Sequence, residues 1–245
     1  MSTLYLIPTP IADAPPEFAI PAGTLTILHR LNTFVVENAK TARAVLKQLQ
    51  YPRPVQGVQL LTLSEHTRND ELQALLAPLL RGEDVGLMSE AGCPGVADPG
   101  ANLVRLAHQH GVNVVPLVGP SALLLALMGS GLNGQRFAFH GYLPTNSGER
   151  IEAIKKLDAR SQRNDETEFF IETPYRNAAL FQALISACRD TTLLCIASGL
   201  MEPTAELHTT RISGWRTRGW QAPKRPTVFL IYSGFYKGGA LDNGK

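Results

Sequence analysis

The chain of 245 residues lacks the features that mark several protein classes. It has three cysteines, Cys93, Cys188 and Cys195, an odd number without metal-ligand spacing, which favours a reducing compartment over a disulfide framework. No apolar run approaches the ~20 residues of a membrane span, and the N-terminus lacks the basic segment of a signal peptide. We therefore expect a cytoplasmic protein that binds neither a membrane nor a metal ion.

The sequence also lacks a strong excess of charge of either sign. Its 23 Lys and Arg residues against 21 Asp and Glu residues leave a net charge of +2, too small to indicate a nucleic-acid partner by itself. The apolar fraction of 44% is ordinary for a globular protein. The length allows one large domain or two domains of about 120 residues each.

Two common nucleotide-binding signatures are absent as well. No G-x-G-x-x-G follows the first predicted strand, where Pro8-Thr9-Pro10 stands instead, and no P-loop sequence occurs. The usual nicotinamide and nucleoside-triphosphate sites are therefore weak hypotheses.

The first half of the chain does contain a regular alternation of strand and helix patterns. Such alternation predicts right-handed crossovers and a mostly parallel sheet, so we predict an N-terminal α/β domain over residues 1–118. The segment Ala12–Gly23 has three prolines and is predicted to be irregular. The predicted strands are Thr3–Ile7, Thr33–Glu37, Gln59–Leu63, Val85–Met88 and Val112–Pro116, and the predicted helices are Ala39–Leu49, Asp70–Leu80 and Gly100–His110.

The second half predicts a C-terminal α/β domain over residues 119–236, followed by a flexible tail, residues 237–245. The last two strand patterns have no long helix between them, which indicates an antiparallel end to a mixed sheet. A polar run, Asp158–Glu168, is predicted to follow the end of a helix at Leu157. The predicted helices are Ser121–Gly129, Ser147–Leu157 and Tyr175–Cys188, and the predicted strands are Phe137–His140, Phe169–Glu172, Leu193–Ala197, Ala205–Ile212 and Thr227–Tyr232.

The most informative segment runs from Leu87 to Ala122 and reads LMSEAGCPGVADPGANLVRLAHQHGVNVVPLVGPSA. A strand leads into a Gly/Pro-rich loop, and such loops at the carboxyl ends of strands are where α/β proteins bind small ligands. A tight turn would also explain the glycines and prolines. However, about ten residues is long for a strand-to-helix connection, which favours a binding role.

Several motifs of this chain resemble one known family. The motifs Ser89-Glu90-Ala91-Gly92-Cys93-Pro94, Ala97-Asp98-Pro99-Gly100 and Gly119-Pro120-Ser121-Ala122 resemble Ser-Asp-Ala-Gly-Thr-Pro, Ser-Asp-Pro-Gly and Gly-Pro-Ser-Ala of the tetrapyrrole methylase superfamily, the class III S-adenosylmethionine-dependent methyltransferases. The branch that they resemble most is the ribosomal RNA small-subunit methyltransferase I family, which 2′-O-methylates a cytidine. Further similar motifs, over about residues 3 to 234, are Leu4–Ile11, Glu65-His66, Gly131-Leu132, Gly141–Pro144 and Glu172-Thr173-Pro174-Tyr175-Arg176.

The resemblance implies two α/β domains with a cleft between them, the first with a mostly parallel sheet and the second with a mixed sheet, usually in a homodimer. S-adenosylmethionine would lie in that cleft. Gly92 would allow close backbone approach, and N–H groups around Ser121 at a helix start could meet a carboxylate. The donor-binding residues implied by the resemblance are Pro8, Glu90, Ala91, Gly92, Val96, Ser121, Ala122, Glu172 and Ala197.

The chain departs from the family pattern mainly in the residues expected to meet the methyl acceptor. The family's Glu-Asp-Thr-Arg is replaced by Glu37-Asn38-Ala39-Lys40, and its Ala-Arg-Glu-Leu-Thr-Lys is replaced by the stretch from Ala197 to Glu202, which begins Ala197-Ser198-Gly199. The second replacement removes an arginine and a lysine of the kind that contact an RNA backbone. The cofactor half of the pattern is therefore better preserved than the substrate half.

A hydroxyl acceptor would need a base or a polarising group. The candidates are Glu37, Glu65, His66 and Glu172, and the sequence does not choose between them; His66 is also interpreted as a residue that hydrogen-bonds its own loop. A basic group near two tryptophans predicts either a nucleic-acid surface or a solvated loop. It consists of Arg211, Arg216, Arg218, Lys224 and Arg225, with Trp215 and Trp220.

Three functional hypotheses follow from these residues. The first is an S-adenosylmethionine-dependent methyltransferase, with RNA as the favoured acceptor. The alternatives are a divergent paralogue that methylates a small molecule and a protein that binds the cofactor without catalysis. The Ser198-Gly199 replacement separates them, because it argues against the family's own RNA reaction.

Overall fold

The computed structural model describes residues 2–13 and 15–234. The chain forms two compact units, Met1–Ser121 and a second unit that begins at Ala122, each with its own sheet and core. The predicted boundary after residue 118 lies just before this division. The predicted tail, residues 237–245, lies outside the described residues.

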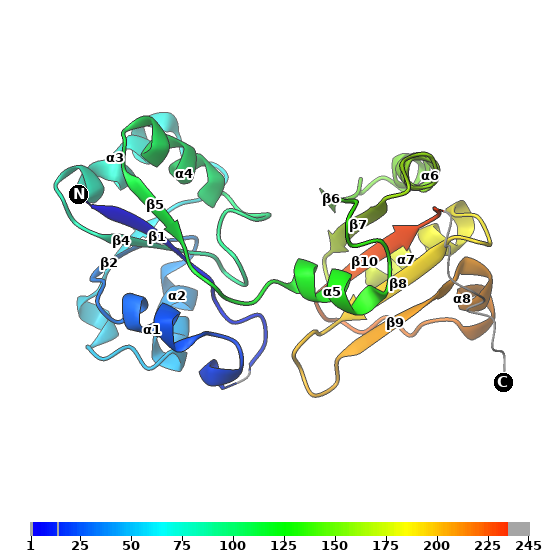
Figure 1. Cartoon of the computed structure of the whole chain (residues 1–245), viewed down its shortest axis with the longest axis horizontal. Helices are drawn as coiled ribbons and strands as arrows, with labels where there is room; N and C mark the ends of the chain where they lie inside the picture. The colour runs from blue at the N-terminus through cyan, green and yellow to red at the C-terminus, as the bar shows by residue number, and fades with distance from the viewer. Residues whose placement is uncertain (1, 14, 235–245) are drawn as a thin grey trace. The chain divides into compact units, whose positions relative to one another are not determined.

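The first unit contains a five-stranded sheet in the order β3-β2-β4-β1-β5 (Figure 1). All pairs of neighbouring strands are parallel, so the predicted parallel sheet is confirmed. All five strands therefore end at the same edge of the sheet. The strands are β1 (Thr3–Ile7), β2 (Thr33–Val36), β3 (Gln59–Thr62), β4 (Val85–Met88) and β5 (Asn113–Pro116).

Helices cover both faces of this sheet (Figure 1). Phe34 packs into the core under α1 and α2, while Val35 packs under α3 and α4, because successive residues of a strand face opposite sides. The prediction that Ala12–Gly23 is irregular holds only in part, since α1 begins at Ala22, directly after Pro21, whose fixed φ is compatible with a helix start. The helices are α1 (Ala22–Leu28), α2 (Ala39–Gln48), α3 (Asn69–Leu80) and α4 (Gly100–Gln109), with short 3-10 turns at Pro16–Phe18 and Val55–Gly57.

The second unit contains a five-stranded mixed sheet in the order β6-β7-β10-β8-β9. β6 and β7 are parallel, whereas β10 is antiparallel to both β7 and β8, and β8 is antiparallel to β9. This confirms the predicted mixed sheet with an antiparallel end. The strands are β6 (Phe137–Tyr142), β7 (Thr167–Glu172), β8 (Leu193–Ser198), β9 (Glu206–Arg211) and β10 (Thr227–Tyr232).

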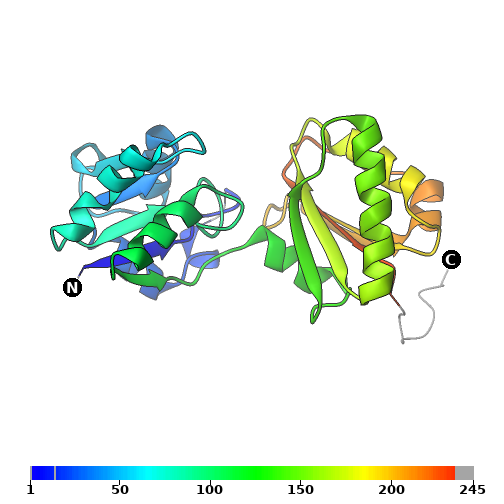
Figure 2. The ribbon, with the colours of Figure 1, turned by 90° about the horizontal axis from the view of Figure 1, so that it is seen from above.

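The helices of the second unit lie on opposite faces of its sheet. α5 (Ala122–Ser130) packs on one face with Phe169 and Leu230. On the other face, α6 (Ser147–Asn164), α7 (Asn177–Ala187) and α8 (Ile212–Arg218) enclose a core that contains Phe170 and Trp215. Figure 2 shows the long α6 beside the strands of this sheet.

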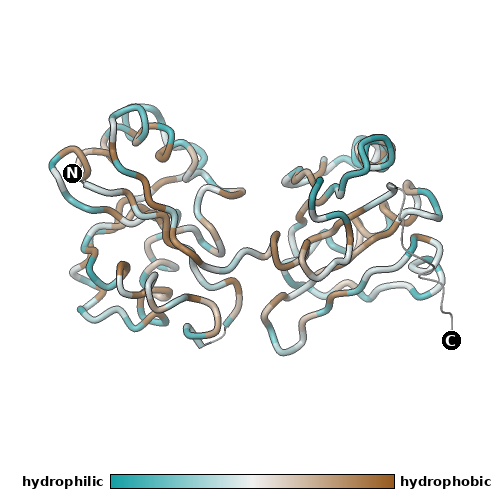
Figure 3. Tube along the Cα trace, viewed as in Figure 1, coloured by the Kyte–Doolittle hydropathy of each residue, from teal (hydrophilic) through white to brown (hydrophobic). Residues whose placement is uncertain are grey.

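The prediction that α6 ends at Leu157 is wrong, because the helix continues to Asn164. Figure 3 shows α6 as a largely hydrophilic helix. Its polar residues are nevertheless paired inside the unit: Asp158 Oδ2 accepts a hydrogen bond from Arg189 Nε at 2.7 Å, and Asp158 Oδ1 accepts one from Thr192 Oγ1 at 2.6 Å. The buried Ser161 hydroxyl donates to the Glu166 carbonyl at 2.7 Å. Distant partners therefore let a polar run continue the helix.

Candidate functional site

The predicted site residues of the first unit follow the carboxyl ends of its strands. Pro8 follows β1, Glu37 follows β2, Glu65 and His66 follow β3, Glu90 to Val96 follow β4, and Ser121 follows β5. Because the sheet is parallel, these residues lie along one edge, which is the edge where α/β sheets bind ligands.

The loop after β1 pairs directly with the loop after β4. Thr9 N donates to the Gly92 carbonyl at 2.9 Å, and Gly92 N donates to the Thr9 carbonyl at 3.1 Å. The Ser89 hydroxyl donates to the same Gly92 carbonyl at 2.8 Å. Gly92 has φ of +80°, a conformation that favours glycine. Thr9 and Gly92, which are 83 positions apart in the chain, therefore belong to one folded element.

The loop after β5 closes on the same element. A Cβ placed on Gly119 would lie 2.3 Å from Pro8 Cβ, so only glycine permits this approach. Cys93 Sγ donates to the Pro120 carbonyl at 3.4 Å, and burial raises the pKa of that thiol. Cys93 thus has the environment of a turn residue and not that of an activated nucleophile.

Glu37 is the catalytic candidate with the most distinctive environment. Glu37 Oε1 accepts a hydrogen bond from the Glu90 backbone N–H at 3.2 Å, across from β2 to the loop after β4. Partial burial is the main cause that raises the pKa of Glu37; the carboxylates of Asp98, Glu90 and Glu65 add to the rise, and the Glu90 hydrogen bond opposes it. A carboxylate with a raised pKa is a stronger base than an exposed one.

The other candidates of the first unit are more open to solvent. Glu65, His66 and Ala91 are exposed, and Val96 is 48% exposed. The His66 backbone N–H donates to Ser64 Oγ at 3.2 Å, within its own loop. Among the predicted catalytic residues, the structure brings Glu37 into contact with the Ser89–Pro94 loop and places Glu65 and His66 farther along the edge.

In the second unit, the predicted residue Glu172 ends β7 and is 3% exposed. Its Oε1 accepts hydrogen bonds from Arg176 Nε at 2.9 Å, from Arg176 Nη2 at 2.6 Å and from the Thr173 backbone N–H at 2.6 Å. Its Oε2 is buried without a hydrogen-bond partner among the described residues. That oxygen is an acceptor suited to a donor group from a ligand.

A buried polar chain beside Glu172 had not been predicted from the sequence. Asn177 Nδ2 donates to the carbonyls of Pro223 at 3.1 Å and Arg225 at 2.8 Å, and to Thr227 Oγ1 at 3.1 Å. Thr227 Oγ1 in turn donates to Ser198 Oγ at 2.9 Å. These residues are far apart in the chain, so no local sequence pattern could predict the hydrogen bonds between them. In the sequence, Ser198 stands out only as a departure from the family pattern.

The remaining predicted residues of the second unit offer few side-chain groups to a ligand. Ala197 is 1% exposed and its side chain packs in the core with α5, so only its backbone is suited to contact a ligand. Ala122 is the first residue of α5 and packs against the same core. Gly199 has φ of +59° and a Cβ there would lie 2.9 Å from Glu202 Oε2, so the Ser198-Gly199 replacement forms a tight turn.

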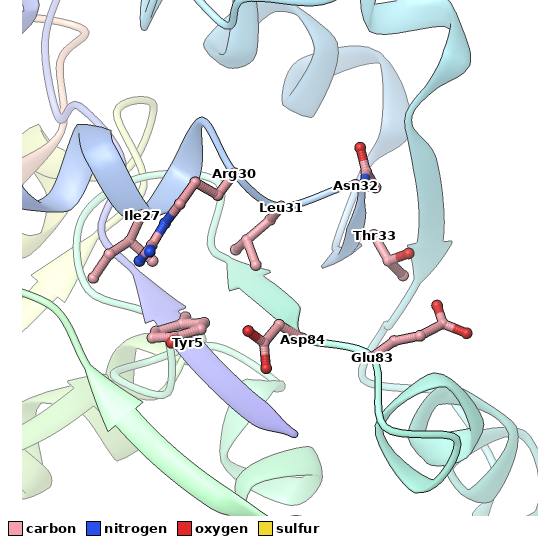
Figure 4. A pocket seen from close by; sticks show the side chains of 8 residues that line it. All are labelled: Tyr5, Ile27, Arg30, Leu31, Asn32, Thr33, Glu83 and Asp84. Atoms are coloured by element: carbon pink, nitrogen blue, oxygen red, sulfur yellow. The ribbon is translucent and has the colours of Figure 1, made fainter. Parts of the chain in front are cut away.

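A separate pocket of about 330 Å³ lies in the first unit (Figure 4). Thr33 begins β2 and Asp84 precedes β4, so this pocket is at the amino ends of the strands. It is therefore not the predicted site, which follows the carboxyl ends. Its lining residues are Tyr5, Ile27, Arg30, Leu31, Asn32, Thr33, Glu83 and Asp84.

The described residues contain neither a metal-binding cluster nor a membrane-spanning helix. Across residues 2–13 and 15–234, no three His, Cys, Asp or Glu side chains are grouped to hold a metal ion. Over the same residues, no helix has the length and apolar character to cross a membrane.

Comparisons with known proteins give a consistent set of relatives. No family model matches the chain. Several curated relatives carry the name ribosomal RNA small subunit methyltransferase I, and three of them illustrate the similarity. The protein from Escherichia coli O157:H7 is 29% identical over 205 residues (84% of this chain, 68% of the relative). The protein from Mesorhizobium japonicum is 33% identical and the match covers 84% of this chain and 66% of the relative. The protein from Vibrio cholerae is 32% identical, over 74% of this chain and 59% of the relative. The chain thus spans about two thirds or less of these relatives' length.

The fold also occurs among solved structures. One of them is the uroporphyrin-III-C-methyltransferase from Thermus thermophilus, with a TM-score of 0.57 and 15% sequence identity over 95% of each chain. At this identity the likeness shows the fold alone.

Proposed function

Because the chain belongs to the tetrapyrrole methylase superfamily, on the branch of the ribosomal RNA small subunit methyltransferase I family, we propose that it is an S-adenosylmethionine-dependent methyltransferase with RNA as its acceptor. The observation that carries the proposal is the assembly of three motifs, Pro8-Thr9, Ser89–Gly92 and Gly119-Pro120, at the carboxyl edge of the first sheet.

The residues at this edge fit a small ligand that is bound through backbone groups. A side chain on Gly119 would meet Pro8, so the loops after β1 and β5 approach one another closely, and Gly92 has a φ of +80° that favours glycine. In the second unit, the buried Glu172 Oε2 is an acceptor without a hydrogen-bond partner among the described residues, which suits it to a donor group. We propose that the donor is held by Pro8, Glu90, Ala91, Gly92, Val96 and Ser121 of the first unit. Ala122, Glu172 and Ala197 of the second unit stay predictions that come from the family resemblance alone.

The bound donor supplies a sulfonium methyl that is already activated. The task of the chain is therefore to position the acceptor and to exclude water. We assign the base to Glu37: the Glu90 N–H orients one carboxylate oxygen, and the other accepts the proton of the acceptor hydroxyl. Its raised pKa suits this role. Glu65 and His66 lie farther along the edge and are proposed to contact the acceptor.

One observation favours a small molecule as a second class of methyl acceptor. The buried Ser198 and the turn at Gly199 occupy positions where the family pattern has cationic and acidic residues. A small-molecule acceptor needs fewer backbone-binding cations than RNA does. Methylation of a small molecule is therefore the second candidate function. A cytoplasmic location and a homodimer remain predictions, the latter to be tested by light scattering.

Calorimetry with S-adenosylmethionine tests the donor. The absence of binding at millimolar donor would refute the proposed cofactor. Once binding is measured, transfer of labelled methyl to small-subunit ribosomal particles, or to a metabolite extract, identifies the acceptor class. Glu37→Gln should abolish transfer while retaining donor binding, and Glu83→Gln, at the opposite edge of the sheet, is the matched control. Donor binding without transfer to either acceptor would favour a non-catalytic protein.

A further inference from the structure

Tyr175 is an exposed aromatic residue just beyond the carboxyl end of β7. It is 82% exposed, in the motif Glu172-Thr173-Pro174-Tyr175-Arg176. A single exposed aromatic side chain needs no functional explanation by itself. What distinguishes Tyr175 is the set of neighbours that hold it and the cation beside its ring.

That cation is the exposed Lys224, whose Nζ lies 5.7 Å from the centroid of the Tyr175 ring. This distance is within the range of a cation–π contact. With 82% of the tyrosine exposed, the ring remains open to a second stacking partner. The pair therefore presents a flat aromatic surface with a positive charge beside it.

One buried side chain anchors both halves of this pair. Asn177, two residues after Tyr175, donates to the carbonyls of Pro223 and Arg225, which flank Lys224 in the chain. Asn177 is completely buried. Because the same residue begins α7 and holds the 223–225 loop, the two backbone segments that carry the ring and the cation are tied to each other.

Most of the other aromatic and basic residues of this region are engaged elsewhere. Trp215 is 2% exposed, and its indole N–H donates to the Leu194 carbonyl at 2.8 Å. Trp220 packs edge-on against Phe181 and Phe229. The tryptophans of the predicted basic group therefore belong to the core of the second unit. Arg216 is paired with Asp190 and Arg225 with Glu202, which reduces their charge available to a partner.

We propose that Tyr175 and Lys224 form a stacking platform for an unpaired base of single-stranded RNA. A nucleobase stacks on the tyrosine ring, and the Lys224 ammonium contacts an adjacent phosphate. Stacking of this kind tolerates different bases, because every base offers a flat face. The inference rests on the proposed RNA acceptor and assigns residues that contact it.

Fluorescence anisotropy with a short fluorescein-labelled single-stranded RNA tests the platform on the full chain. Tyr175→Ala should raise the Kd by about tenfold, whereas Tyr175→Phe, which keeps the ring, should bind like the parent. Lys224→Gln should lower the slope of log K against log salt by about 0.7, the value for one phosphate contact on a single strand. Lys156→Gln, an exposed lysine on α6, is the matched control and should leave the slope unchanged.

Calorimetry with S-adenosylmethionine on the same variants separates this inference from the proposed function. Parent and Tyr175→Ala should bind the donor equally. The platform is refuted if Tyr175→Ala binds the RNA as well as the parent does, or if Tyr175→Phe loses as much affinity as Tyr175→Ala. A loss of donor binding in Tyr175→Ala, with RNA binding intact, would also overturn it and would leave the methyltransferase proposal standing. Failure of the parent to bind the donor would instead refute the proposed function.

Discussion

Replacement of Gly119 by alanine tests whether the donor site depends on close contact between the loops that follow β1 and β5. An alanine Cβ at this position would lie 2.3 Å from Pro8 Cβ and 2.8 Å from Pro8 Cγ. Non-bonded carbon atoms prefer about 3.5–4.0 Å, so one loop must move by on the order of 1 Å. Overpacking of this kind typically costs about 1–3 kcal/mol.

The expected fall in the Tm of the first unit is roughly 4–12 °C, since a unit of about 120 residues loses about 4 °C per kcal/mol. A shift of about 1 Å in a binding wall should also raise the Kd for S-adenosylmethionine by at least about tenfold. Differential scanning calorimetry measures the first effect and titration calorimetry, at a temperature where the variant is folded, measures the second.

Gly57→Ala is the matched control for Gly119→Ala. An added Cβ at Gly57 has no heavy atom within 4 Å, and its backbone is not in the left-handed region. Its stability should change by less than about 0.5 kcal/mol. If Gly119→Ala has the Tm and the donor affinity of the parent, the contact between Pro8 and Gly119 does not shape the site, and the reasoning is refuted.

Three further predictions concern single side chains. Glu37→Gln should raise the Tm at neutral pH, because the raised pKa of Glu37 means that folding penalises its ionised form. The gain should disappear below pH 4.5, where the carboxyl is protonated in both states; a gain that persists there would contradict this account. Asp158→Ala should destabilise the second unit by about 1–3 kcal/mol in urea unfolding, because the buried Asp158 carboxylate accepts from Arg189 Nε and Thr192 Oγ1, and an unchanged midpoint would exclude that role. Burial raises the pKa of Cys195 to about 11, so a thiol reagent should modify Cys93 in the native protein and Cys195 only after unfolding. Mass spectrometry of the labelled native protein locates the label, and a label on Cys195 would contradict this prediction.

The sheet of the first unit could be predicted because its signals are local. Each strand is a short apolar run, and each helix that follows has an apolar stripe, so alternation alone predicts a parallel sheet. Parallel pairing then places every strand end at one edge. For this reason, the sequence could place Glu37 at the same edge as the Ser89–Pro94 loop, whereas the pairing of β2 with β4 and the hydrogen bond to the Glu90 N–H come from the structure.

The end of α6 and the polar chain at Asn177 could not be predicted, because their energetics depend on distant partners. Asp158 reads as a helix-ending polar residue until Arg189 and Thr192 are placed beside it. Asn177 has no partner within its own helix; its hydrogen bonds reach residues 46 to 50 positions away. Neither case has a periodic pattern that a local reading could detect.

The order of strands in the second sheet has a consequence for the way the chain is made. Among the strands of the described residues, β10 is the last along the chain, yet it lies in the middle of its sheet, between β7 and β8. The first sheet is complete in sequence once β5 has left the ribosome, whereas β7 and β8 each expose an unpaired edge until Thr227–Tyr232 arrives. Translation therefore imposes an interval in which one unit can fold and the other still needs protection from misassembly.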